Sequence, residues 1–389
     1  MAASRTFLIV SVLLILASAA VAKEPVQVFI LAGQSNMEGK AAVTTLDAVI
    51  RDEKTRAQFQ HLKDGDDWVV RDDVFVTYLD REETPVSPLH GPLTVGFGSP
   101  KNVRDDSGKR IRVAGVGPEL GIGWALGEAL DDPVLLIKAA WGGRAVKYTF
   151  RPPSAMPTDE EIKVRLAEIQ TKNPDMTFEE LKDSYGRDYR KVISETKRVL
   201  DHIDEYVPGY DKSAGYELAG FIWFQGWNDG VGAGNPEYTE QLAHFIRDVR
   251  RDLNAPKLPF VIGQLGTDGE AAEGWVANFR GQQAAVAQIE EFQGNVKLAK
   301  TAHLWPNPPD LSAQWTAFRA AAQENEKKPA NDRTRIDPGE FFRTNWQLKY
   351  KDELAYTSDK RYHYLGSGAC YYQMGMAMGQ AMLKLLEGE

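Results

Sequence analysis

Cysteine is almost absent from this chain of 389 residues, which contains only Cys370. One thiol cannot close an internal disulfide, so we exclude a disulfide scaffold, a cysteine-type zinc protein and an iron–sulfur protein. Basic blocks are lacking as well: the net charge is −9, which argues against nucleic acid and anionic membranes as partners. Hydrophobic residues make up 43% of the chain, enough to bury a substantial core without covalent staples.

Long apolar runs are missing beyond the N-terminus, so no later segment predicts a membrane span. The N-terminus has the three parts of an export signal: Arg5, a mostly apolar stretch at 7–16 and a small-x-small site at 20–22. We expect residues 1–22 to be a signal peptide and the exported protein to be periplasmic or extracellular, without stable membrane insertion. An uncleaved N-terminal anchor is the alternative.

Short apolar runs predict the strands of a sheet. Each has the length of a buried parallel strand, and most are rich in Val, Ile, Leu or Phe. The predicted strands cover residues 26–32, 134–140, 219–224, 258–264 and 295–301. Helical patterns lie between these runs or after the last one, at 117–130, 236–253, 272–292 and 366–386. This alternation predicts an α/β fold with a mainly parallel sheet.

Three segments fit the alternation of strands and helices poorly, at 46–110, 151–216 and 305–358. The first of them could include an extra strand at 73–78. None contains enough apolar sequence to form a core of its own. We therefore interpret all three as insertions into a single domain that covers residues 23–389.

Polar and glycine-rich residues follow several of the predicted strands. In a parallel α/β sheet the ligand site lies beyond the carboxyl ends of the strands. Ser35 lies two residues after a glycine that ends the first strand. Its hydroxyl could act there as a nucleophile, and its N–H could help to bind an oxyanion. On position alone, a helix N-cap is an equal alternative for this serine.

A nucleophilic serine needs a base, and His363 is our first choice among the six histidines. It lies just before the last predicted helix, in a loop that could reach the sheet edge. His303, after the last predicted strand, is the second choice. A carboxylate usually orients such a base, and Asp359 stands four residues before His363. A turn or cap residue is the alternative for this aspartate.

Oxyanion donors are available after two other strands. Gly143 belongs to a glycine pair and could offer a backbone N–H, because no side chain blocks a close approach. Asn228 and Gln225 each carry a side-chain amide that could donate a hydrogen bond to an oxyanion. Asp229, beside them, could instead hold a neighbouring loop.

These residues carry a family resemblance. Residues 33–37, Gly-Gln-Ser-Asn-Met, resemble the nucleophile block of SGNH hydrolases, and more narrowly that of sialate O-acetylesterase-like carbohydrate esterases. The glycine pair at 142–143 resembles the second block of that superfamily, and Gly-Trp-Asn-Asp at 226–229 resembles the third. His363 with the Tyr-Leu-Gly-Ser that follows it resembles the last block. Four blocks in the expected order are a specific signal, whereas a single short block would be weak.

The resemblance implies a three-layer α/β/α sandwich with a mainly parallel, five-stranded sheet. It also implies hydrolysis of acetyl esters on an oligo- or polysaccharide, by a serine esterase with no metal and no cofactor. His363 would take the proton from Ser35 as the serine attacks the acetyl carbonyl. The oxyanion would be held by the N–H groups of Ser35 and Gly143 and by Asn228, with Gln225 as the rival of Asn228.

Two positions depart from the family pattern. Superfamily members usually have Asp three residues before the catalytic His, where this chain has Lys360. Either the turn is one residue longer and Asp359 orients His363, or a backbone carbonyl or another acid does so. The acetylesterase branch also often has Gln-Gly-Glu-Ser where this chain has Gln-Gly-Trp-Asn, which leaves the particular substrate open.

Several residues near the strand ends could bind a glycan. Trp141 and Trp227 could stack on sugar rings, or fill the core instead. Arg144 could recognise a carboxylate or sulfate with a forked contact, or pair with a structural acid. We also place Gln34 with the substrate-binding residues. The basic stretch at 101–112 could favour an acidic polysaccharide, and a solvated charge run is the alternative.

Two other functions are open. One is a non-catalytic carbohydrate-binding protein on an esterase fold, which the lysine at position 360 would fit. The other is an esterase that acts on a lipid or a thioester. The charged insertions favour a glycan over a lipid, because a lipid esterase should have a more continuous apolar rim around its site.

Overall fold

The computed structural model describes residues 24–105, 107–306, 311–334 and 357–388. The expected signal peptide therefore lies outside the described residues. Within these ranges, no helix combines the length and the hydropathy that crossing a membrane requires.

A seven-stranded sheet forms the centre of the molecule, in the order β12-β11-β10-β1-β9-β5-β6. Its neighbouring strands are parallel except β5 and β6, which are antiparallel. The strands are β1 (Val26–Gly33), β5 (Val74–Thr77), β6 (His90–Pro92), β9 (Val134–Ala140), β10 (Tyr216–Phe224), β11 (Phe260–Gly263) and β12 (Val296–Ala299). The five predicted strands are all present, so the prediction of a mainly parallel α/β sheet is confirmed.

The strand count differs from the predicted five, because the insertion at 46–110 adds two strands. One is β5, the extra strand considered at 73–78; its four residues are all buried and pair with β9. The other is β6, whose three residues include a glycine and a proline and lie at the sheet edge. Proline is tolerated at an edge because its missing N–H faces no neighbouring strand.

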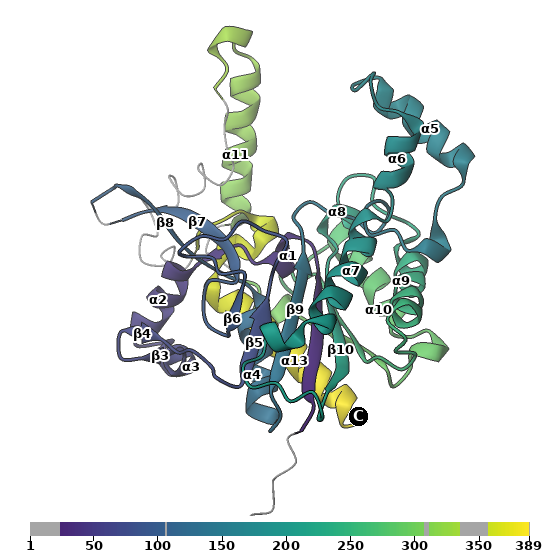
Figure 1. The fold of residues 1–389 in the computed structure, drawn as a ribbon. Coiled ribbons are helices and arrows are strands. Elements are labelled where there is room, and N and C mark those ends of the chain that lie inside the picture. Colours follow the sequence, from purple (N-terminus) through teal and green to yellow (C-terminus); the bar gives the residue numbers. More distant parts are fainter. Residues whose placement is uncertain (1–23, 106, 307–310, 335–356, 389) are drawn as a thin grey trace, which may run out of the picture.

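Helices cover both faces of the sheet, which gives three layers (Figure 1). Phe29 and Leu31 of β1 belong to one hydrophobic cluster, and Ile30 and Ala32 belong to another. Successive strand residues point to opposite faces, so both faces of this strand are buried, as expected of a parallel sheet. The first cluster includes residues of α2 (Val43–Arg51), α4 (Pro118–Ala129) and α13 (Gly368–Leu386), and the second residues of α7 (Arg187–Asp201), α9 (Tyr238–Asp252) and α10 (Trp275–Val286).

Short elements complete the fold around this centre. Two small antiparallel sheets have the strand orders β2-β8-β7 and β3-β4. Their strands are β2 (Ala41–Ala42), β3 (Lys63–Asp64), β4 (Asp67–Trp68), β7 (Gly98–Arg104) and β8 (Arg110–Val116). The remaining α-helices are α1 (Ser35–Glu38), α3 (Arg56–Phe59), α5 (Asp159–Gln170), α6 (Phe178–Ser184), α8 (Trp227–Gly230) and α11 (Leu311–Glu326). The 3₁₀ turns are η1 (Gln60–Leu62), η2 (Pro153–Ala155), η3 (Ile203–Glu205), η4 (Glu290–Phe292), η5 (Ala302–Leu304), η6 (Ala330–Asp332) and η7 (Arg361–Gly366).

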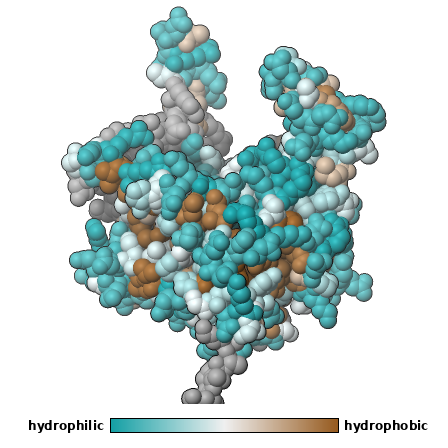
Figure 2. Space-filling model, viewed as in Figure 1, coloured by the Kyte–Doolittle hydropathy of each residue, from teal (hydrophilic) through white to brown (hydrophobic). Residues whose placement is uncertain are grey.

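Helices of the second and third predicted insertions project beyond the carboxyl ends of the strands. In Figure 1, the helix pair α5–α6 and the helix α11 extend upward from the edge of the sheet where α1 and α8 lie. The pair α5–α6 has a small apolar cluster of its own, built on Ile162, Leu181 and Tyr185. Figure 2, in the same view as Figure 1, shows a mostly hydrophilic surface, with hydrophobic patches below the projecting helices.

Candidate active site

Three of the four sequence blocks leave the sheet side by side. Gly33, the last residue of β1, pairs with Phe224 of β10 on one side and with Ala140 of β9 on the other. The segments that begin at residues 34, 141 and 225 therefore start from one level of the sheet edge. Gly33 has φ +153°, and a Cβ atom there would lie 2.2 Å from the carbonyl oxygen of Phe224. Only glycine fits at this close approach between strands.

Ser35 is the first residue of α1 and is 5% exposed. The N-cap position belongs to Gln34, so Ser35 is not the N-cap that its position alone would also have allowed. Gly142 lies beside it: a Cβ atom on Gly142 would be 3.8 Å from the Cβ atom of Ser35. The glycine pair and the serine therefore adjoin, as the resemblance implies for a nucleophile and its oxyanion site.

Gln34 holds the third block in place. Its Oε1 accepts hydrogen bonds from the backbone N–H of Gly226 at 3.1 Å and of Asn228 at 3.3 Å. Its Nε2 donates to Oδ1 of Asn228 at 3.1 Å. Both ends of the buried Gln34 amide are thus used inside the protein. The same contact fixes the orientation of the Asn228 amide, because its oxygen is engaged and its NH₂ group is the end left to donate.

Gln225 uses its amide differently. Its Nε2 donates to the backbone carbonyl of Arg144 at 3.1 Å and to Oδ2 of Asp229 at 2.6 Å. Both amide hydrogens are therefore committed to the protein, and Gln225 is 2% exposed. Of the two rival side-chain donors, Gln225 has both amide hydrogens engaged, whereas the NH₂ group of Asn228 donates to no other described residue.

Asp229 is fully buried and holds the segment that follows the glycine pair. It accepts hydrogen bonds from the backbone N–H groups of Val146 at 2.7 Å and Lys147 at 3.2 Å, and from Asn235 Nδ2 at 2.8 Å. Burial raises the pKa of Asp229, and these hydrogen bonds oppose that rise. This matches the loop-holding alternative for Asp229.

His363 and Asp359 come together in the loop before α13. Nδ1 of His363 lies 3.2 Å from Oδ1 of Asp359, although the two atoms are not aligned as a hydrogen bond. Oδ1 also accepts a 2.6 Å hydrogen bond from the backbone N–H of Lys360. The carboxylate thus meets the imidazole despite the four-residue spacing. His303, the second choice for a base, is exposed and follows β12 at the far edge of the sheet.

The backbone of this loop is tightly wound. Tyr364, Leu365 and Gly366 follow His363 with φ values of +51°, +55° and +64°. Two of these are not glycine, so the loop stores conformational strain close to the histidine. At Gly366 a Cβ atom would lie 2.5 Å from the backbone nitrogen of Asp359. This winding folds the residues after His363 back onto the segment before it, where the backbone N–H of Asp359 donates to the carbonyl of Leu365 at 2.9 Å.

Asn36 ties the serine turn to the histidine loop. Its Nδ2 donates to the backbone carbonyl of Tyr362 at 3.1 Å, and its Oδ1 accepts from the hydroxyl of Tyr371 at 2.9 Å. Asn36 follows Ser35, and Tyr362 precedes His363. The contact therefore joins the immediate neighbours of the two predicted catalytic residues, which are 328 positions apart in the sequence.

The electrostatics of the loop keep the histidine neutral and the aspartate charged. Burial lowers the pKa of His363; Asp359 opposes this, while the charges of Lys40 and Lys101 lower it further. Burial raises the pKa of Asp359, but the proximity of His363 and the charge and hydrogen bond of Lys101 outweigh it and hold the pKa well below its usual range. A neutral imidazole beside a carboxylate can accept a proton from a hydroxyl.

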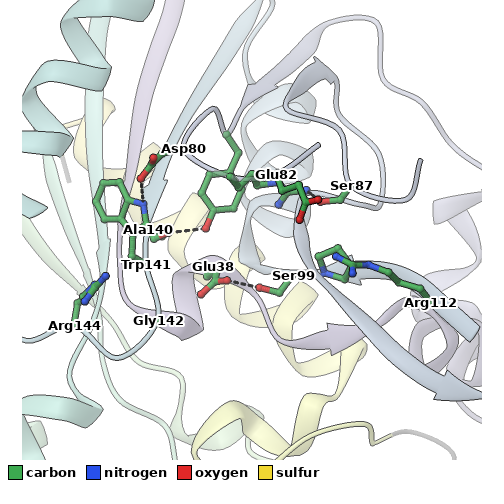
Figure 3. A pocket seen from close by; sticks show the side chains of 13 residues that line it. Glu38, Asp80, Glu82, Ser87, Ser99, Arg112, Ala140, Trp141, Gly142 and Arg144 are labelled. Carbon is green, nitrogen blue, oxygen red and sulfur yellow. Dashed lines mark hydrogen bonds between the residues drawn. The ribbon is translucent and has the colours of Figure 1, made fainter. Parts of the chain in front are cut away.

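A cavity of about 330 Å³ adjoins the serine turn. It lies between the ends of β1 and β9 and the first insertion, and Glu38, Gly142, Trp141 and Arg144 form part of its wall (Figure 3). The ring nitrogen of Trp141 donates to Oδ2 of Asp80 at 2.6 Å. The other lining residues are Tyr78, Asp80, Arg81, Glu82, Ser87, Ser99, Pro100, Arg112 and Ala140.

The predicted substrate-binding residues lie on two sides of Ser35. Arg144 has its Nε 3.2 Å from a carboxylate oxygen of the buried Asp188, which is the pairing with a structural acid, and it still lines the cavity. Trp227 is half-buried and packs against Trp275 and Tyr362, with ring centres 5.0 and 5.3 Å apart. Trp141 therefore belongs to the cavity side and Trp227 to the histidine side.

Several contacts of the site's residues were not predicted from the sequence. The roles of Asn36 and Gln34 depend on partners about 190 to 330 positions away. Lys101 was treated as part of a basic run, yet it forms an ion pair with Asp359. The one available signal was the position of Gln34 and Asn36 inside the nucleophile block. Among the described residues, no group of three or more His, Cys, Asp or Glu side chains is arranged to hold a metal ion.

A mainly parallel sheet with the nucleophile block at its carboxyl edge is the arrangement of SGNH-like hydrolases. The family model for the carbohydrate esterases described as sialic acid-specific acetylesterases matches residues 25–305. The match covers well over half of the sequence, so the chain belongs to this family. No curated protein sequence matches the chain.

Solved structures with similar folds include three at low sequence identity. A protein from Arabidopsis thaliana is 16% identical, with a TM-score of 0.46 over 92% of this chain and 98% of its own. A carbohydrate acetylesterase from Xanthomonas citri is 16% identical, with a TM-score of 0.38 over 72% of this chain and 51% of its own. NanS is 15% identical, with a TM-score of 0.41 over 72% of this chain and 78% of its own. These TM-scores are all below 0.5, so the family model alone carries the assignment.

Proposed function

We propose that the protein removes O-acetyl groups from a glycan through a covalent acetyl-serine. Oγ of Ser35 attacks the acetyl carbonyl and His363 takes the hydroxyl proton, which forms a tetrahedral oxyanion. The bond to the sugar oxygen then breaks, and His363 protonates the leaving sugar hydroxyl. Water repeats the sequence on the acetyl-serine, with His363 as the base, and acetate is released. Asp359 holds the imidazole in the productive tautomer.

The contact of Asn36 with the carbonyl of Tyr362 is the observation that carries this proposal. Nδ2 of Asn36, the residue after Ser35, lies 3.1 Å from the carbonyl oxygen of Tyr362, the residue before His363. The serine turn and the histidine loop are otherwise remote in sequence and belong to different elements. A hydrogen bond that joins the two segments is expected if the side chains of Ser35 and His363 act on one substrate.

The proposed oxyanion hole consists of the N–H groups of Ser35 and Gly143 and the NH₂ group of Asn228. Gly143 has φ +74°, and a Cβ atom there would meet nothing within 4 Å, so its peptide is open to a substrate. Gln34 keeps the Asn228 oxygen turned away from the oxyanion. We therefore assign Gln34 a positioning role in place of a substrate-binding one, and we do not assign Gln225 to the hole.

The cavity beside Gly142 is the proposed site for the sugar that carries the acetyl group. Its wall combines an indole, carboxylates and guanidinium groups, which suit the C–H faces and hydroxyls of a sugar. Trp141 and Arg144 line this site, and Trp227 flanks the opposite side. We propose that the glycan is met outside the cytoplasm, after cleavage of the signal peptide at residues 1–22.

Acetate release from a panel of acetylated xylan, pectin, sialic acid and algal glycans tests the proposed activity, together with p-nitrophenyl acetate. The Ser35→Ala variant should lose activity by a factor of roughly 10³ or more. Ser154→Ala is a demanding control, because Ser154 Oγ lies 2.8 Å from His244 Nδ1 on the surface. It should retain full activity. Wild-type chain that releases no acetate, or loses nothing in Ser35→Ala, would leave a binding protein as the better description.

A further inference from the structure

The hairpin β7–β8, whose strand β7 belongs to the first insertion, reaches the histidine loop. The ammonium group of Lys101, on β7, donates to Oδ2 of Asp359. The two side chains are 16% and 13% exposed, so the ion pair is largely shielded from water. Charge-assisted hydrogen bonds of this kind are stronger and more directional than solvated ones. The two charges lie 258 positions apart in the sequence.

The two oxygens of Asp359 have separate partners. Oδ2 meets Lys101, whereas Oδ1 accepts from the backbone N–H of Lys360 and lies 3.2 Å from Nδ1 of His363. Rotation of the carboxylate about its terminal torsion would exchange these oxygens or turn both away from the imidazole. The ammonium group on one oxygen and the peptide N–H on the other together define one plane for the carboxylate.

We propose that Lys101 is a positioning residue of the active site, which holds Oδ2 of Asp359 so that Oδ1 faces His363. The lysine compensates for the aspartate standing four residues before the histidine. It acts through Asp359, and the inference rests on the proposed function of Ser35 and His363. The inserted hairpin is, on this view, part of the catalytic geometry as well as a wall of the cavity.

The charged groups that face His363 give this role a measurable signature. They are Asp359 from its own loop, Lys101 from β7 and Lys40 from the segment after α1. Loss of the Lys101 charge by itself should raise the pKa of the imidazole. Loss of the orientation of Asp359 should lower that pKa, because the imidazolium would lose a close partner. The two effects oppose one another, and removal of the Asp359 charge separates them.

The test is an NMR titration of the His363 imidazole in the full chain, assigned with a His363→Gln variant. Lys101→Met is measured alone and together with Asp359→Asn. In the Asp359→Asn background the lysine substitution should raise the imidazole pKa by roughly half a unit or more. In the chain that keeps Asp359 the rise should be clearly smaller, or become a fall. Equal increments in the two backgrounds would overturn the proposal.

Two further variants guard against loss of folding as an explanation. Lys101→Arg keeps the charge and a donor, and should retain a near wild-type titration. Lys109→Met removes an exposed positive charge close to the same hairpin turn and should leave the titration unchanged. If Lys109→Met raises the imidazole pKa as much as Lys101→Met does in the Asp359→Asn background, the effect is general electrostatics and the proposal fails.

Turnover gives a second, independent readout. Lys101→Met should lower kcat roughly tenfold or more in the wild-type background, and by about twofold at most in the Asp359→Asn background. Equal losses in both backgrounds contradict an action through Asp359. The titration needs no turnover, so the two proposals fail separately: missing ester hydrolysis removes the proposed function, and equal pKa increments remove the role of Lys101.

Discussion

Replacement of Asn228 by alanine tests the proposed oxyanion hole most directly. The substitution removes one NH₂ donor and leaves the backbone N–H groups of Ser35 and Gly143 in place. It also frees Nε2 of Gln34, which donates to the Asn228 side chain in the wild type. Oε1 of Gln34 keeps its hydrogen bonds from the backbone N–H groups of Gly226 and residue 228. The frame of the site should therefore survive while one donor to the developing oxyanion is lost.

The expected cost is large in kcat and small in KM. Loss of one oxyanion donor lowers kcat by roughly 10²–10³, or about 2.7–4 kcal/mol of transition-state stabilisation. The donor meets full negative charge only in the tetrahedral state, so substrate binding should change little. Asn228→Asp should be at least as damaging, because a carboxylate offers no donor and repels the oxyanion.

The assay is kcat and KM for p-nitrophenyl acetate, with thermal unfolding measured in parallel. Asn278→Ala, an exposed position on α10, is the matched control and should match the wild type. Gln225→Ala should mainly lower stability, because its amide bonds to Arg144 and Asp229 inside the protein. If Asn228→Ala keeps kcat within about fivefold while Gln225→Ala loses roughly 10² at an unchanged Tm, the two amides have been assigned the wrong way round.

Two further outcomes follow from buried charges. In the proposed mechanism His363 must be neutral to accept the serine proton, and burial lowers its pKa. The acidic limb of kcat/KM should therefore have its midpoint below 6.5, the ordinary histidine value, and a higher midpoint contradicts this. Lys138 is fully buried against Glu119 at 2.7 Å, and burial lowers its pKa to about 8. Lys138→Met leaves the Glu119 carboxylate without its cation and should lower the free energy of unfolding by about 3–5 kcal/mol, measured by denaturant titration. The control Lys300→Met, at an exposed position, should change it by less than about 0.5 kcal/mol. Equal losses would contradict the importance of the pair.

The central strands could be predicted because their signal is local. Residues 26–32 and 134–140 form short, almost wholly apolar runs, and they appear in the structure as β1 and β9. The edge strand β6 could not be predicted, since its three residues, His-Gly-Pro, carry no apolar period. It becomes a strand because β5 offers unpaired backbone groups beside it.

The candidate site could be predicted only as far as its residues stand in recognisable blocks. Ser35, Gly143 and Asn228 follow strands that the sequence shows, and parallel strands bring their carboxyl ends together. The choice between Asn228 and Gln225 depends on which amide is already satisfied, and that is decided by Gln34 and Asp229. Such side-chain pairing across distant segments leaves no pattern in a single sequence.

The contact between His363 and Asp359 could not be predicted from the sequence either. A four-residue spacing does not by itself say whether the carboxylate reaches the imidazole. In the structure the chain after His363 folds back onto Asp359 through Tyr364 and Leu365, whose positive φ values no propensity favours in non-glycine residues. The surrounding contacts impose this winding, including the hydroxyl of Tyr364, which accepts from the backbone N–H of Gly266 at 2.8 Å.

Strand β7 of the first insertion contacts both the serine turn and the histidine loop. Ser99 donates to Glu38, which stands three residues after Ser35, and accepts a 2.8 Å hydrogen bond from Lys40. Two residues further along the same strand, Lys101 binds Asp359. The hairpin that closes the cavity therefore also spaces the serine turn from the histidine loop. We therefore expect a change in this strand to alter both kcat and KM of the proposed reaction.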